Sequence, residues 1–203
     1  MSESGKLILS GDLGEFFRQE VETARTDLGL KLTDVVEYYL VNLLCEFSEA
    51  QRHQRLGEEP LALMYKRAQD ADSVERMALL KTLGDAALYT AGFFTEFIER
   101  SLVDLDYYVS MGGNAYRDLS AIVGGQRRGE AFGELYEQLG KRFTELVDVL
   151  NQIAERSQQQ AERNTDLLRL YDRWNRTGSQ RIQRLLVEKG LLPWQGRPSD
   201  DLQ

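Results

Sequence analysis

The chain has 203 residues, of which 42% are hydrophobic and 29% charged, a balance typical of a folded globular protein. Its formal net charge of −8 argues against a protein whose whole surface binds nucleic acid, so we do not expect that partner. The single cysteine excludes an intramolecular disulfide, and we find neither a signal peptide nor a transmembrane segment, which predicts a cytoplasmic protein.

Apolar residues recur at helical spacing over most of the chain, and no strand pattern stands out. Residues 1–9 are expected to be a frayed start. Ser101-x-x-Asp104 is a helix-start pattern and predicts a break within the apolar stretch 74–123, although one continuous helix is an alternative. The predicted helices cover about residues 13–28, 34–47, 60–67, 74–98, 104–122, 130–163 and 164–190.

These elements predict an all-α fold, a single-domain helical bundle of six to seven helices spanning residues 1–203. Segment 84–116 is apolar almost all round, so a central buried helical pair is expected there. Asp72 or Ser73 can cap the fourth helix. The tail, residues 191–203, is expected to be non-helical, and Trp194 within it could dock onto the same chain or a second copy.

The chain lacks the residues that common catalytic and metal sites require. Its one histidine, His53, and its one cysteine, Cys45, cannot supply a zinc or di-iron site, so no metal and no cofactor is expected. No nucleophile elbow, Walker loop or dinucleotide-binding motif is found. The sequence therefore indicates no catalytic residues, leaving only a carboxylate–tyrosine acid/base pair as an open alternative.

Polar side chains within the central segment form the first candidate site. A buried charge must be paired or used, so these residues either fix helix register through an Arg100–Asp104 or Arg100–Asp106 ion pair or orient a ligand. The candidate ligand-binding residues are Asp85, Tyr89, Arg100, Asp106, Tyr108 and Tyr116.

The last predicted helix is the second candidate. Residues 163–189 hold seven cations and three acids, a net charge of +4 inside an acidic chain. This face could meet an anionic partner, or it could be a solvated face paired with acidic neighbours. The candidate residues of this basic face are Arg169, Arg173, Arg176 and Arg184.

Several segments together resemble an uncharacterised bacterial all-helical family, over about residues 35–193. The resemblance implies a cytoplasmic bacterial single domain and carries no activity, cofactor or partner. The matching segments are YLVNLL at 39–44, PLALM at 60–64, GDAALYTAGFF at 84–94, VDLDYYVSMGGNAY at 103–116 and LYDRWNRTGS at 170–179.

Two functions follow as hypotheses. The first is a non-catalytic interaction or regulatory protein that self-associates as a homo-oligomer or binds another protein. The alternative is a small-ligand-binding protein with an interhelical pocket lined by Tyr, Arg and Asp. A closed centre with Arg100 and Asp106 paired would favour the first, whereas a pocket of about 300 Å³ or more lined by the candidate tyrosines would favour the second.

Overall fold

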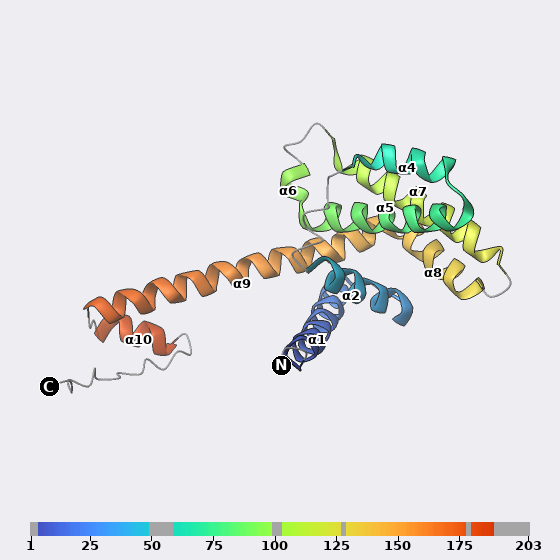
Figure 1. Cartoon of the computed structure of the whole chain (residues 1–203). Helices are drawn as coiled ribbons and strands as arrows, with labels where there is room; N and C mark the ends of the chain where they lie inside the picture. The colour runs from blue at the N-terminus through green and yellow to red at the C-terminus, as the bar shows by residue number, and fades with distance from the viewer. Residues whose placement is uncertain (1–3, 49–58, 99–102, 127–128, 178–179, 189–203) are drawn as a thin grey trace. The chain divides into compact units, whose positions relative to one another are not determined.

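The computed structural model describes residues 4–48, 59–98, 103–126, 129–177 and 180–188. Over these residues the fold is all-α, as predicted, with nine helices and no strand (Figure 1). Among them, no helix is both long and apolar enough to span a membrane. The helices are α1 Ser4–Asp27, α2 Asp34–Ser48, α4 Leu61–Asp70, α5 Ser73–Phe93, α6 Thr95–Ile98, α7 Leu105–Gly124, α8 Glu130–Lys141, α9 Phe143–Thr177 and α10 Gln180–Glu188.

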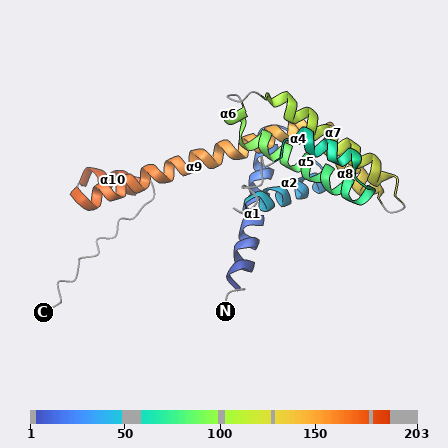
Figure 2. The same cartoon turned by 45° about the horizontal axis from the view of Figure 1, so that its top comes forward.

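The chain divides into two compact units, Met1–Ala154 and Glu155–Gln203, where the sequence analysis treated residues 1–203 as one domain. The first unit contains α1, α2, α4 to α8 and the first turns of α9. The second contains the rest of α9 and α10. Figures 1 and 2 both show α10 lying beside the C-terminal part of α9, where Leu186 of α10 is fully buried.

Local capping explains where the central helices begin. Asp72 accepts hydrogen bonds from the backbone amides of Val74 and Glu75 at the start of α5. Asp104 accepts from the amide of Tyr107 at the start of α7. Stretch 74–123 is therefore interrupted rather than one helix, and the break predicted at Asp104 is confirmed. Ser101, the other half of that pattern, lies outside the described residues.

Several predicted helix boundaries are wrong. The helix predicted over residues 74–98 ends at Phe93, and α6 follows as a separate short helix. Helix α1 already begins at Ser4, because no proline interrupts the segment expected to be frayed. The predicted helix 130–163 is two helices: the Arg142 amide bonds back to Gln138, and the Arg142 guanidinium reaches the carbonyl oxygen of Lys31. No break occurs at residue 164, because residues 143–177 contain neither glycine nor proline.

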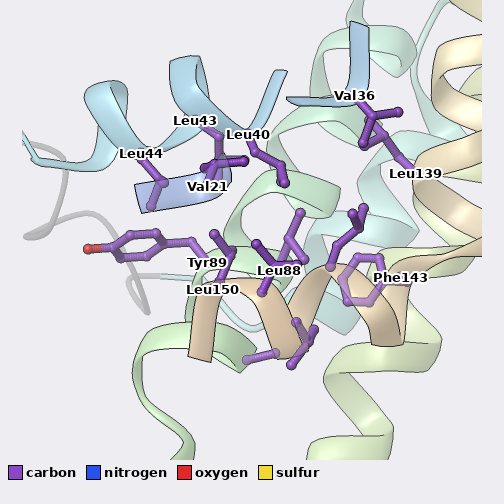
Figure 3. Close-up of a cluster of buried hydrophobic side chains, with 14 of the residues drawn as sticks. Val21, Val36, Leu40, Leu43, Leu44, Leu88, Tyr89, Leu139, Phe143 and Leu150 are labelled. Carbon is purple, nitrogen blue, oxygen red and sulfur yellow. The ribbon is translucent and has the colours of Figure 1, made fainter. Parts of the chain in front are cut away.

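The main core joins α1, α2, α5, α7, α8 and the start of α9. Figure 3 shows leucines of α2 facing Leu88 of α5 and Leu150 of α9. A smaller cluster joins α4, α5 and α7 around Leu83 and Leu119. Both central helices thus supply core residues, which confirms the central buried pair. Among the described residues of the first unit, the fully buried leucines and isoleucines are Leu40, Leu44, Leu80, Leu83, Leu88, Leu119, Leu139, Leu146, Leu150, Ile98 and Ile153.

Helices α7 and α8 pack with their backbones in close contact. A Cβ atom on Gly133 would lie only 2.9 Å from the Cα of Gly124, and one on Gly140 would lie 2.9 Å from the carbonyl oxygen of Gly113. The hydroxyl of Ser120 donates to the carbonyl oxygen of Gly133 across the same contact, over 2.8 Å. Glycine is therefore required at this crossing, because any side chain would force the helices apart.

Candidate functional site

A buried carboxylate lies at the centre of the first unit. Asp85 of α5 is only 6% exposed. The hydroxyls of Tyr39 in α2 and Tyr116 in α7 both donate to its Oδ1, over 2.5 and 2.7 Å. The ammonium of Lys81, one turn earlier in α5, donates to its Oδ2 over 2.6 Å. Three donors therefore satisfy the buried charge, as a carboxylate in this environment requires.

Aromatic rings enclose this cluster. Tyr136 of α8 stacks on Tyr116 at 6.1 Å between ring centroids and meets Tyr39 edge-on at 6.1 Å. The Lys81 ammonium lies 5.5 Å from the centroid of the Tyr39 ring, within range of a cation–π contact. Gly84 permits the arrangement, because a Cβ atom there would lie 2.5 Å from the Tyr116 ring. We call Tyr39, Lys81, Asp85, Tyr116 and Tyr136 the Asp85 cluster.

The environment keeps the tyrosines of this cluster protonated. Burial raises the pKa of Tyr39 far above its usual value, and the nearby Asp85 charge raises it further. The same two causes raise the pKa of the fully buried Tyr116. Burial also raises the pKa of Tyr136, although the Lys81 charge opposes this shift. All three phenols are therefore neutral hydrogen-bond donors near neutral pH.

Lys81 remains charged within the same cluster. Burial alone would lower its pKa, but the attraction and hydrogen bond of Asp85, together with the charge of Glu46, outweigh that effect, so the pKa is raised. The side chain keeps 42% of its surface exposed. The ammonium is thus fixed in direction by Asp85 and the Tyr39 ring and still reaches the surface.

An open groove of about 260 Å³ adjoins the cluster, between α5, α7 and α8. Most of its walls are apolar, and Phe132 at its side is 60% exposed. Lys81 and Tyr136 are its polar members, and the Tyr136 hydroxyl has no hydrogen-bond partner among the described residues. The groove residues are Met77, Ala78, Lys81, Leu119, Val123, Phe132 and Tyr136.

Of the five candidate ligand residues that the structure describes, only Asp85 and Tyr116 come together. Tyr89 stacks instead between Phe47 and Phe93 in the main core, where burial raises its pKa to about 12. Its hydroxyl points away from the labelled core side chains (Figure 3).

The remaining candidates do not join the Asp85 cluster. Tyr108 is half-buried and meets Tyr107 edge-on. Asp106 is exposed, and Arg100 lies outside the described residues. None of the five candidate ligand residues that the structure describes lines the groove. This groove is therefore not the predicted pocket lined by the candidate tyrosines. Its polar residues are Lys81 and Tyr136.

Three cluster residues were missed by the sequence analysis: Tyr39, Lys81 and Tyr136. Lys81 had a detectable signal, since it precedes Asp85 by one helical turn, the spacing of a helical ion pair. Tyr39 and Tyr136 approach from α2 and α8, and their alignment with Asp85 depends on tertiary packing. No local pattern in the sequence could have revealed them.

The candidate basic face lies in the second unit. Arg169, Arg173 and Arg176 of α9 and Arg184 of α10 are all exposed. Arg169 lies 3.8 Å from Asp166, so this face is partly neutralised by its own helix. Exposed pairs of this kind contribute little to stability. Trp194, the proposed docking residue of the tail, lies outside the described residues.

The described residues contain no group of three or more His, Cys, Asp or Glu side chains that could hold a metal ion. Cys45 is half-buried, and burial raises the pKa of its thiol, while His53 lies outside the described residues. No family model, curated protein or solved structure matched the chain in comparisons with known proteins. The interpretation of the site therefore rests on the contacts within the Asp85 cluster and along the groove.

Proposed function

We propose that this protein is a non-catalytic interaction protein that binds a segment of a partner protein in the groove between α5, α7 and α8. The observation that carries the proposal is the apolar groove itself, with Phe132 60% exposed beside it. Large apolar side chains that stay exposed around a concave surface are typical of protein-binding sites. A second copy of the chain is one candidate partner.

The protonation states of the Asp85 cluster support a non-catalytic role. A general acid or base works best with a pKa near the operating pH. Burial instead raises the pKa of Tyr39 and Tyr116, and Asp85 raises that of Lys81. Asp85 already accepts three hydrogen bonds. The cluster is therefore suited to hold groups in place rather than to transfer protons.

The shape of the groove favours a protein segment over a small ligand. Its volume of about 260 Å³ is below the roughly 300–1,000 Å³ usual for small-molecule pockets, and it is open along one side. Val74, which is 73% exposed, continues the groove face of α5 one turn beyond Met77 and Ala78. A row of this spacing suits a helix laid into a groove.

The test places a photo-cross-linking benzoylphenylalanine at Phe132 of the full chain in its own host cells. The matched control carries the same group at Tyr38, an aromatic residue that is 70% exposed on α2 and does not line the groove. We expect a covalent protein adduct at Phe132 that is absent at Tyr38, with mass spectrometry identifying the partner. Equal labelling at both positions, or no protein adduct at Phe132, would contradict the proposal.

A further inference from the structure

The Asp85 cluster holds a cation in a fixed position beside an apolar groove. Tyr39 and Tyr116 bind one oxygen of Asp85, and the other oxygen holds Lys81. The Lys81 stem lines the groove, one turn along α5 from Met77 and Ala78. Asp85 is buried while the Lys81 side chain is 42% exposed, so the buried carboxylate directs a cation that solvent and a ligand can still reach.

The part of the groove formed by Lys81 and Tyr136 has hydrogen-bond donors that can still bind a ligand. An ammonium has three N–H donors, and Asp85 takes one from Lys81. The Tyr136 hydroxyl, which lines the same groove, has no hydrogen-bond acceptor among the described residues. A charged donor and a neutral donor are thus both available to a ligand in the groove.

We infer that the groove recognises an amphipathic helix of a partner protein in which an acidic residue lies about one turn from an apolar anchor. The inference rests on the proposed function and names the chemistry of its partner. The anchor packs against Met77, Val123 and Phe132. The carboxylate of the Asp or Glu accepts hydrogen bonds from Lys81 and Tyr136, the charge-assisted kind that contributes most.

The spacing of the groove fits this arrangement. Lys81 follows Met77 by four residues in α5, so its side chain stands about 6 Å further along the helix axis. A docked helix lying along α5 presents residues three or four apart at that same separation. An apolar side chain and a carboxylate at that spacing therefore meet the apolar wall and Lys81 together.

The net charge of −8 makes the expected salt dependence distinctive. Long-range repulsion opposes an acidic partner, whereas a carboxylate bound in the groove would meet Lys81 where that side chain is only 42% exposed. Salt screens exposed charges more than partly buried pairs. We therefore expect affinity to stay constant or rise as salt increases, where simple electrostatic attraction would make it fall.

The experiment selects binders to the immobilised full-length protein from a displayed library of alanine-based helices of about 15 residues, with four positions on one face randomised. We expect selected helices to carry Asp or Glu three or four positions from an apolar residue. Their affinity should fall about tenfold to a hundredfold on K81M/D85N, in which the introduced amide oxygen can still accept from both tyrosines. Y136F should cause a smaller loss, and K66M, which changes an exposed lysine of α4, none.

A double-mutant cycle makes the assignment specific. Replacing the selected acid of the helix by its amide should weaken binding to the native protein but not to K81M/D85N. Selected helices that bind both proteins equally, or that carry amides as often as acids, would overturn the inference while leaving groove binding intact. Binders that tolerate F132A unchanged would instead overturn the proposed function, because they would not use the groove.

Discussion

The hydroxyl of Tyr116 in α7 donates a 2.7 Å hydrogen bond to Oδ1 of Asp85 in α5. This bond joins the two central helices at a point where both residues are buried. Tyr39 of α2 donates to the same oxygen, so one carboxylate links three helices. Pairings of this kind specify which faces of the helices meet, a role that apolar packing alone fills less strictly.

Tyr116→Phe should lower the free energy of unfolding by about 1–3 kcal/mol, because it removes one donor from a buried charged acceptor while preserving the ring. Urea unfolding followed by circular dichroism measures this change. Tyr38→Phe is the control, since Tyr38 is 70% exposed, and we expect a change below about 0.5 kcal/mol. Equal effects of the two substitutions would contradict the importance of the Asp85 bond.

Asp85→Ala should be the most destabilising change in the cluster, at about 3 kcal/mol or more, because it leaves two buried hydroxyls and an ammonium without their acceptor. The double variant K81M/D85N should stay within about 1.5 kcal/mol of the native protein, because the asparagine oxygen still accepts from both tyrosines. The same urea titration compares them. Similar losses for both variants would show that the polar network is not what Asp85→Ala disrupts.

Gly84→Ala should destabilise by about 1–3 kcal/mol, because the added methyl group would overlap the Tyr116 ring. Gly14→Ala is a matched control in α1, where nothing lies within 4 Å of the added Cβ. That change should instead stabilise the protein by about 0.5–1 kcal/mol through helix propensity. Thermal unfolding of the two variants shows whether each substitution lowers or raises stability. A stabilising Gly84→Ala would argue against the close packing of Gly84 on the Tyr116 ring.

Stability should fall at alkaline pH. The pKa values of Tyr39 and Tyr116 are raised in the folded state, so these phenols ionise first in the unfolded chain. These two tyrosines contribute fully to the free energy of unfolding below about pH 10. Above that pH, the free energy of unfolding falls by about 1.4 kcal/mol per pH unit for each tyrosine. Tyr89, whose folded pKa is about 12, and Lys81, whose pKa is also raised, act in the same direction.

Urea unfolding between about pH 9 and pH 11 measures this slope. Tyr39→Phe should make it shallower, because the substituted residue no longer takes part in the proton linkage. An unchanged slope in that variant would mean that Tyr39 ionises in the folded protein as readily as in the unfolded one.

The parts of the fold that the sequence predicts are those set by local chemistry. Asp72 and Asp104 cap the helices that follow them, and both starts could be predicted from the residue types. The corner between α8 and α9 could not, because Arg142 is held there by the carbonyl oxygen of Lys31, 111 residues away. Such a contact leaves no periodic signal near Arg142.

The candidate site divides in the same way. Asp85 and Tyr116 stood out as polar groups in an apolar stretch, and they do meet. Tyr39 looks like an ordinary member of an apolar stripe, although its hydroxyl reaches Asp85. The groove is still less visible in the sequence, because its walls come from three helices and its volume depends on how those helices cross.

The glycine contact between α7 and α8 has a consequence for anything that enters the groove. Leu119 and Val123 stand on one of these helices, Phe132 and Tyr136 on the other. Backbones that already touch cannot move closer, and the hydrogen bond from Ser120 resists their separation. The spacing of α7 and α8 therefore fixes the width of the groove. An incoming chain must have side chains that fit this width.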